Sequence, residues 1–306
     1  MAQGFDSFFG FYSGWIDYYS HRYYTLGGQP VFHDLWRDGT EVFEEPFYQT
    51  ELLAKEATGF IERQRAEQPF FLYLAFGAPH YPMMAPKQYV DRFPATMDRD
   101  RRLHLAMVAA VDDAIGQIRS TLKSRGLTND TIVFFMSDNG ATHESRADHR
   151  GRPYEGGSNR PFRAWKGSLL EGGMRVPGLL AYPGAIAPRV EDATLAAMDL
   201  MPSVLRMAGA ALPGGMDGMD ASRLLVSKRP LPARTMFWEY DGQSAARSGE
   251  WKLLTSYREG LGQPLQNGPW LSNLKADPAE TRNFAADKAE IVARLSDEIA
   301  TWKAKH

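Results

Sequence analysis

Apolar and polar residues alternate along the chain in blocks that predict helices and strands in turn. Apolar residues at three- and four-residue spacing predict helices, and these helices cover 49–64, 103–122, 193–208 and 288–303. Short, almost wholly apolar runs predict strands buried on both faces, and these strands fall within 70–76, 131–136 and 176–184. The chain therefore reads as an alternation of the two kinds of element.

This alternation favours an α/β layer fold. Strands joined by crossovers of such length pair in parallel, and helices are expected to cover both faces of the sheet. We predict that 70–76 and 131–136 are neighbouring parallel strands, which lead into "GAPH" and "SDNG". Ligands of such sheets bind beyond the carboxyl ends of the strands. His80, Asp138 and Asn139 are therefore predicted to share one pocket, with Lys166 beside them.

The last third of the chain predicts a separate, smaller unit. A glycine-rich stretch at 212–220 is followed by strand-like segments at 235–240 and 250–257, a loop and the final helix. A small antiparallel sheet backed by a helix fits this pattern. We expect one domain over 1–210 and a second over 211–306. Four aromatic residues of the smaller one are candidates to face a substrate, although core packing is the better interpretation of each: Trp238, Tyr240, Trp251 and Trp270.

Composition excludes several classes of function. The 306 residues carry a net charge of -2, which leaves no basic excess for a nucleic acid or an anionic membrane surface. No apolar run approaches the ~20 residues that cross a bilayer, and the mean hydropathy is -0.40. The chain has no cysteine, which excludes disulfides, thiolate metal sites and a cysteine nucleophile.

The Asp138–Asn139 pair is a candidate metal site. A carboxylate beside an amide carbonyl is a hard-oxygen pair suited to Ca²⁺ or Mg²⁺ and less suited to zinc. The alternative is a plain turn, because Asp, Asn and Gly are common turn residues. Sequence composition alone leaves both interpretations open.

Six motifs, in order, resemble the sulfatase family of the alkaline-phosphatase-like superfamily. The likeness runs from Gly4 to Trp302. The motifs are "FFLYLAFGAPHYP", "NDTIVFFMSDNG", "WKGSLLEGGMRVP", "MDLMPSVLRMAG", "EWKLL" and "ADPAETRN". The resemblance implies a mostly parallel sheet sandwiched by helices, with its first strands missing, plus a small C-terminal α+β subdomain.

The resemblance also implies roles for single residues. Asp138 and Asn139 correspond to ligands of one divalent ion, usually Ca²⁺, with Mg²⁺ as the other option. His80 corresponds to a histidine that contacts the sulfate ester, and Lys166 to a lysine paired with the same sulfate oxygens. The implied reaction is hydrolysis of a small-molecule or saccharide sulfate ester.

One residue separates the sulfatases from their relatives. Phosphodiesterases and mutases of the superfamily tend to have histidine where this chain has Asn139, because that histidine helps hold a second metal ion. Asparagine therefore favours one hard cation and a sulfate, and a phosphodiesterase or phosphonate hydrolase is the alternative. His104, His143 and His149 are predicted to be surface residues. Asp112–Asp113 falls within a helical period and is interpreted as packing and solvation.

The chain departs from the family at the nucleophile. Before the point where this chain starts, the family carries an Asp–Asp metal pair that follows its first strand and a Cys/Ser-x-Pro-x-Arg motif, whose first residue becomes formylglycine. The chain contains neither that first strand with its metal pair nor the motif. We therefore expect the chain to be an N-terminally truncated fragment that is inactive alone. Export of the intact protein to the periplasm or medium is expected by analogy. The alternative is a non-catalytic sulfatase-like protein that binds sulfated ligands.

Overall fold

The computed structural model describes residues 4–23, 31–65, 67–145 and 152–305. Contacts divide the chain into two compact units, which we describe separately. The N-terminal unit comprises Met1–Leu127, Ala141–Asn159 and Gly260–Gly262. The C-terminal unit comprises Thr128–Gly140, Arg160–Glu259 and Gln263–His306. The expected domain boundary at residue 210 rests on sequence and stays a prediction.

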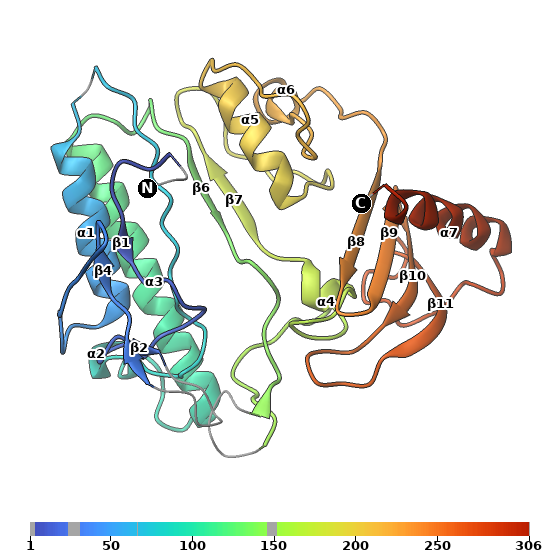
Figure 1. Ribbon diagram of the computed structural model, residues 1–306, viewed down its shortest axis with the longest axis horizontal. Coiled ribbons are helices and arrows are strands. Elements are labelled where there is room, and N and C mark those ends of the chain that lie inside the picture. Colours follow the sequence, from blue (N-terminus) through green and yellow to red (C-terminus); the bar gives the residue numbers. More distant parts are fainter. Residues whose placement is uncertain (1–3, 24–30, 66, 146–151, 306) are drawn as a thin grey trace. The chain divides into compact units, whose positions relative to one another are not determined.

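Two long helices form the centre of the N-terminal unit. Helix α1 (Gln49–Arg63) and helix α3 (Arg99–Ser124) lie side by side, drawn in blue and green in Figure 1. Both were predicted from apolar spacing, and α3 begins four residues earlier than expected. Beside α3 lies the one-turn helix α2 (Lys87–Val90). A buried cluster of tyrosines and small residues fills the core of this unit: Tyr18, Tyr48, Ala78, Tyr89, Ala106, Met107, Ala110 and Val111.

Local signals set both ends of α3. Asp98 precedes the helix, and its Oδ1 accepts hydrogen bonds of 3.0 Å from the backbone N–H groups of Asp100 and Arg101. At the other end Gly126 adopts a φ of +72°, which favours glycine. Leu127 then donates its N–H to the carbonyl of Leu122 at 2.9 Å. The glycine exit predicted from sequence is confirmed.

Five very short strands make two small antiparallel sheets before α1. The first has the order β1-β4-β5, and the second is the pair β2–β3. Their bounds are β1 Phe9–Gly10, β2 Arg22–Tyr23, β3 Phe32–His33, β4 Trp36–Arg37 and β5 Thr40–Glu41. In the pair β2–β3, Arg22 lies opposite His33. Sequence periodicity did not predict these strands, because two residues are too few to show a period.

The apolar run at 70–76 differs from its prediction. It lies outside any assigned strand, and its exposure alternates along the chain, with Phe71 68% and Tyr73 72% exposed. A strand buried on both faces was expected here, and that expectation is wrong. An apolar run shows that both faces could be covered, but burial itself depends on partners that are distant in sequence.

A four-stranded antiparallel sheet dominates the C-terminal unit. Its order is β11-β10-β9-β8, visible in orange in Figure 1. The bounds are β8 Thr235–Tyr240, β9 Gln243–Ser248, β10 Trp251–Tyr257 and β11 Gln266–Asn273. Strands β8 and β10 were predicted, and the antiparallel sheet with a final helix is confirmed. Strand β9 was not predicted, and the segment that forms β11 was predicted to be a loop.

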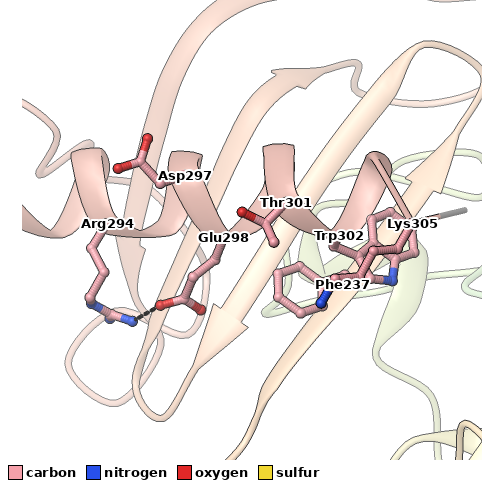
Figure 2. Close-up of a pocket in the computed structure, with 7 residues that line it drawn as sticks. All are labelled: Phe237, Arg294, Asp297, Glu298, Thr301, Trp302 and Lys305. Atoms are coloured by element: carbon pink, nitrogen blue, oxygen red, sulfur yellow. Dashed lines mark hydrogen bonds and ion pairs between the residues drawn. The ribbon is translucent and has the colours of Figure 1, made fainter.

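Helix α7 (Ala289–Lys303) covers one face of this sheet. Leu295 and Ile299 of the helix pack on buried leucines of β10 and β11. Figure 2 shows a hollow along α7 in which the Trp302 ring stacks on Phe237 of β8, with centroids 5.5 Å apart. The dashed line in Figure 2 joins Arg294 to Glu298 one turn on. The ring contact and the buried leucines fix the helix to the sheet, and we interpret the hollow as part of that packing.

The remaining elements of the C-terminal unit include those that carry the sequence motifs. Strand β6 (Val133–Met136) pairs with β7 (Gly178–Ala181), and the pairing is antiparallel. Every strand pair among the described residues is antiparallel, so the predicted parallel pairing of 70–76 with 131–136 is not observed. Leu179 of β7 is 62% exposed, which contradicts burial on both faces. Three short helices complete the unit: α4 Glu171–Met174, α5 Leu200–Met207 and α6 Ser222–Ser227.

Helix α5 starts later than predicted. The 3₁₀ helix Ala197–Asp199 precedes it, and residues 193–196 are not helical. The buried Asp199 accepts a hydrogen bond of 2.8 Å from the N–H of Ala196, which turns the chain into the helix. Arg234 pairs with the same carboxylate and neutralises it. No helix in the described part of the chain has the length and apolarity to span a bilayer.

Candidate functional site

The Ser-Asp-Asn-Gly segment forms a tight polar turn directly after β6. The hydroxyl of Ser137 donates to the carbonyl of Asn139 at 2.9 Å, and Oδ1 of Asp138 accepts the Asn139 N–H at 3.0 Å. The Asp138 side chain is exposed, and Asn139 is half-buried. Gly140 donates its N–H to the carbonyl of Gly173 at 3.1 Å. The turn is therefore ordered by its own side chains and attached to α4.

Helix α4 needs its two glycines because backbone passes very close to them. A Cβ at Gly172 would lie 2.3 Å from the carbonyl oxygen of Arg163. A Cβ at Gly173 would lie 2.2 Å from the carbonyl oxygen of Ser168 and 2.7 Å from that of Trp165. Real Cβ atoms do not approach backbone so closely. The Glu-Gly-Gly sequence is thus explained by packing of α4 on the segment just before it.

Lys166 lies in that preceding segment, on the turn from Trp165 to Ser168. Ser168 donates its N–H to the carbonyl of Trp165 at 3.0 Å, which closes the turn. The buried side chain of Gln243 on β9 holds it: Nε2 donates to the carbonyl of Gly167 at 2.8 Å, and Oε1 accepts the N–H of Leu169 at 3.2 Å. Lys166 itself is half-buried. Its position is therefore fixed by backbone and by a side chain from the C-terminal sheet.

Gly173 is the point at which the two motifs meet. Its carbonyl accepts the N–H of Gly140, at the end of the Asp138–Asn139 turn. Its Cα faces the carbonyls of Trp165 and Ser168, which bracket Lys166. A carboxylate, an amide and a cation are thus presented by segments packed on the same short helix. Such a set can bind an anion together with the metal ion that neutralises it.

A buried ion cluster joins α4 to the C-terminal sheet. Lys252 of β10 is fully buried, and its Nζ donates to Oε1 of Glu171 at 2.9 Å and lies 3.4 Å from Oε1 of Glu280. Burial acts to raise the pKa of Glu171, but the charge and hydrogen bond of Lys252, together with the charges of Arg247 and Arg175, hold that pKa below its usual value. Burial raises the pKa of Glu280 despite the same cation. This cluster was not predicted from the sequence, because its members are far apart along the chain.

His80 belongs to the N-terminal unit, on the "GAPH" segment. Its ring stacks against Trp15 with centroids 5.7 Å apart, and its carbonyl accepts the Tyr18 hydroxyl at 2.9 Å. Nδ1 lies 2.7 Å from the carbonyl of Tyr81. Because a carbonyl only accepts, Nδ1 carries a proton, and Nε2 is the ring atom that can meet a ligand. A shared pocket for His80, Asp138 and Lys166 stays a prediction.

Comparison with known proteins decides the family. The family model described as "Sulfatase" matches residues 1–210, and the model "N-sulphoglucosamine sulphohydrolase, C-terminal" matches residues 165–305. The chain belongs to the sulfatase family. The resemblance drawn from the six motifs is therefore confirmed.

Named relatives agree with this assignment. The chain is 33% identical to mouse (Mus musculus) N-acetylgalactosamine-6-sulfatase over 264 residues, which are 82% of this chain and 48% of that protein. It is 33% identical to human (Homo sapiens) arylsulfatase A over 244 residues, 73% of this chain and 46% of that protein. The chain thus spans about half the length of these curated relatives.

Similarity to a solved structure confirms the fold class. The crystal structure of Ps i-CgsB aligns with a TM-score of 0.81 and 28% identity, over 98% of this chain and 66% of that one. The α/β class of the alkaline-phosphatase-like fold, with its small C-terminal subdomain, is therefore confirmed. The antiparallel pairing of β6 with β7 is a feature of the part of the fold that this chain contains.

The sulfatase donor set suits a hard cation only in part. Asp138 and Asn139 offer one carboxylate and one amide, which match the oxygen ligands that Ca²⁺ and Mg²⁺ prefer. Ca²⁺ takes about six to eight oxygens. Among the described residues, the groups of three or more His, Asp or Glu close enough to share an ion do not include Asp138. The side-chain oxygens of Asp138 and Asn139 are therefore of the type that Ca²⁺ or Mg²⁺ binds, but they are fewer than half of the ligands that Ca²⁺ takes.

One expectation about the remaining histidines and acidic residues is wrong, that for His104. His104 was expected at the surface, but it is half-buried on α3, 6.4 Å from the Tyr154 ring, with Nδ1 buried and unpartnered within the described residues. His143 is half-buried, and His149 lies outside the described residues. Asp113 forms a two-bond ion pair with Arg92, in accord with solvation of the Asp112–Asp113 pair.

His104 makes stability depend on pH. Burial lowers the pKa of His104 to about 4, and Arg101 adds to the effect. The unfolded chain, with a histidine pKa near 6.5, binds the proton first as the pH falls. The free energy of unfolding should therefore drop by up to about 1.4 kcal/mol per pH unit between pH 6.5 and 4. Urea unfolding of wild type and His104→Gln at pH 7, 6 and 5 measures this, and parallel pH curves would contradict it.

Three of the four aromatic candidates within 211–306 prove to be packing residues. Trp238 and Trp270 pack against one buried cluster, and Trp251 packs against another. Arg163 lies over the Trp270 ring at 4.4 Å from its centroid. Tyr240 is 47% exposed. The expectation of core packing is confirmed for the three tryptophans, and Tyr240 alone is left as a candidate to face solvent or substrate.

Proposed function

We propose that this chain provides the sulfate-binding and part of the metal-binding apparatus of a sulfuric ester hydrolase of the arylsulfatase type. One observation carries the proposal: the Asp138–Asn139 turn and the Lys166 turn are both packed on Gly173 in a chain of the sulfatase family. The residues proposed as the metal pair and as the sulfate-binding cation therefore lie on segments that pack on one short helix. For His80, which belongs to the N-terminal unit, the proposed role rests on the family resemblance alone.

The residue types suit sulfate ester cleavage. Breaking the S–O bond builds negative charge on the leaving oxygen and on the sulfate oxygens. Lys166 donates to those oxygens, and a protonated His80 donates from Nε2, because its Nδ1 is held by the Tyr81 carbonyl. Asp138 and Asn139 hold the cation, proposed to be Ca²⁺ or Mg²⁺, which supplies further charge stabilisation when bound.

The substrate is proposed to be a sulfate monoester of a saccharide or another small molecule. The name of the relative N-acetylgalactosamine-6-sulfatase supports a sulfated sugar, and that of arylsulfatase A supports an aryl ester. Asn139 favours sulfate over phosphate, because the related phosphodiesterases tend to use a histidine there to hold a second metal ion. A phosphodiesterase or phosphonate hydrolase is accordingly the weaker alternative.

A second candidate is a sulfatase-like protein without catalytic activity. The observation that favours it is the absence of cysteine and of any Ser-x-Pro-x-Arg sequence in the 306 residues, since sulfatases generally use formylglycine as nucleophile. Such a protein would keep its affinity for sulfated ligands through Lys166. Activity measurements on a chain that carries the nucleophile motif distinguish the two candidates.

Lys166 gives the direct test of the proposed site. In an active chain with the nucleophile motif and matured formylglycine, Lys166→Ala should lower kcat/KM for an aryl sulfate about 10²–10³-fold, the usual cost of one charge-stabilising donor. Lys166→Arg should recover part of the loss, because the positive charge is kept. Lys275→Ala, at an exposed position of the same unit, is the matched control and should retain full activity. Activity of Lys166→Ala within threefold of wild type would refute the proposed role.

A further inference from the structure

A second group of ligand-type side chains lies in the N-terminal unit, apart from every motif discussed above. His21 immediately precedes β2, His33 is in β3, and Glu45 lies between β5 and α1. One ligand atom from each lies within 4.8 Å of the other two, and His33 Nε2 is 3.6 Å from Glu45 Oε1. Two imidazoles and a carboxylate thus converge on one point.

The outer nitrogen of each imidazole is already held. Nε2 of His21 lies 3.1 Å from the carbonyl of Phe47, and because a carbonyl only accepts, Nε2 carries the proton. Nδ1 of His33 donates to the Glu41 carboxylate at 2.9 Å. With these nitrogens protonated, the lone pair of each ring in its neutral form points inward, from Nδ1 of His21 and Nε2 of His33. Metal-ligating histidines are oriented by contacts of this kind with carbonyls and carboxylates.

The two inward nitrogens are buried and unpaired. His21 is 0% exposed, and the His33 side chain is 6% exposed. Within the described residues, His21 Nδ1 and His33 Nε2 have no hydrogen-bond partner. Buried polar atoms without a partner cost about 1–3 kcal/mol each, so such atoms are rare and need an explanation. A cation shared by both nitrogens satisfies both.

The backbone at His21 is held in an uncommon conformation. Its φ is +51°, in the left-handed region that a residue with a Cβ seldom adopts. Two backbone hydrogen bonds fix it: its N–H donates to the carbonyl of Asp17 at 3.1 Å, and its carbonyl accepts from Asp34 at 2.9 Å. Strain of this kind is concentrated at ligand and active sites. Here it directs the imidazole toward His33.

We propose that His21, His33 and Glu45 form a binding site for one Zn²⁺ ion, with Glu41 orienting His33. Two imidazoles and one carboxylate, with a fourth position left to water, are a familiar zinc ligand set. Ca²⁺ and Mg²⁺ prefer oxygen ligands, so the site is chemically distinct from the Asp138–Asn139 pair.

The geometry is close to that of a bound ion. With zinc–ligand distances near 2.0–2.1 Å, tetrahedral ligand atoms lie about 3.3 Å apart. The distance of 3.6 Å from His33 Nε2 to Glu45 Oε1 is close to this value. Any two ligand atoms that are as far apart as the 4.8 Å limit would have to approach by roughly 1.5 Å when the ion binds. Glu45 is one-third exposed and gives the ion a path of entry. The bound ion would fix the β2–β3 pair to the segment that leads into α1.

Metal titration tests this site independently of sulfatase activity. The chelator-treated 306-residue chain, without a histidine tag, is titrated with ZnCl₂ by calorimetry in excess Ca²⁺. We expect one Zn²⁺ per chain, a raised Tm, and visible absorption typical of tetrahedral coordination when Co²⁺ replaces Zn²⁺. Asp138→Asn should bind Zn²⁺ like wild type. A folded chain that takes up no Zn²⁺ at micromolar concentration would overturn the proposal.

Variants assign the ligands. His33→Gln and Glu45→Gln should each weaken Zn²⁺ binding at least 100-fold, and Glu41→Gln should weaken it about 10–100-fold, as for other outer partners of ligating histidines. Glu44→Gln, next to the ligand, is the matched control and should leave affinity unchanged. Glu45 is at the surface, so its variant should fold, and circular dichroism checks this. Unchanged Zn²⁺ affinity in both ligand variants would show that the ion binds elsewhere.

Discussion

Replacing Lys252 by methionine should lower the free energy of unfolding by about 3–5 kcal/mol at pH 7. The substitution keeps most of the side-chain volume, but it removes the cation that lies between the buried carboxylates of Glu171 and Glu280 and leaves Glu171 with the more distant Arg175, at 3.7 Å. Lys303→Ala removes a surface ion pair with Glu239 in the same unit and is the matched control. Its cost should stay below about 1 kcal/mol. Urea unfolding followed by circular dichroism measures both.

The pH dependence of this loss separates charge from packing. In Lys252→Met, the pKa values of Glu171 and Glu280 should both lie above their unfolded values, since burial, the largest influence on each, then loses the main charge that opposes it. The folded variant consequently binds protons that the unfolded chain does not, and its stability should rise as the pH falls from 7 toward 4.5. The deficit relative to wild type should shrink over the same range. A deficit independent of pH would indicate that lost packing is responsible.

The Lys252 cluster also explains why distant motifs of the family occur together. Glu171 is part of "WKGSLLEGGMRVP", Lys252 of "EWKLL" and Glu280 of "ADPAETRN". The backbone N–H of Glu171 donates to Oε2 of Glu280 at 2.5 Å. The motif with Lys166 is thereby fixed to the C-terminal sheet through buried charge. Loss of the cluster should displace α4 and, with it, the backbone that carries the proposed sulfate site.

Local signals in the sequence predicted the helices well. α1, α3 and α7 follow apolar spacing over 15 residues or more, and the capping residue Asp98 and exit glycine Gly126 mark the ends of α3. These signals act within a few residues of the element that they define. Helices can be predicted reliably from sequence for that reason.

Strand pairing could not be predicted in the same way. The apolar runs before the "GAPH" and "SDNG" segments showed strand length, but neither their partners nor the direction of pairing. Strand β6 pairs with β7, more than 40 residues further on, in antiparallel register. The run at 70–76 has its alternate side chains exposed. Pairing and burial depend on contacts distant in sequence, which no local pattern records.

In the candidate site, too, some residues could be predicted from a local motif, and others could not, because they act through contacts distant in sequence. Its chemical residues were predicted because the motifs resemble those of a family, and the family is confirmed. The residues that hold them were missed: Gln243 lies 74 residues from the Leu169 N–H that it binds, and Lys252 lies 81 from Glu171. His21 and His33 were missed as well, because only the pairing of β2 with β3 brings their unpartnered ring nitrogens close together.

The 306-residue chain by itself is expected to show no sulfatase turnover. A formylglycine nucleophile requires a cysteine or serine in its motif, and the sequence contains no cysteine and no Ser-x-Pro-x-Arg. Loss of a nucleophile commonly removes several powers of ten in rate. Ca²⁺ affinity should be millimolar or weaker, because Asp138 and Asn139 supply two of about six to eight oxygens.

The comparison that decides this is between two chains. One is residues 1–306, and the other is extended by the residues that its gene encodes upstream, provided these include Cys/Ser-x-Pro-x-Arg, and is matured by a formylglycine-generating enzyme. Hydrolysis of an aryl sulfate in added Ca²⁺ should rise by several powers of ten in the extended chain, and replacing its nucleophile by alanine should abolish the gain. Turnover by residues 1–306 that survives purification and disappears in Lys166→Ala would mean that the chain has a nucleophile other than formylglycine. An upstream sequence without the motif, with a stable inactive product, would favour the non-catalytic sulfatase-like protein.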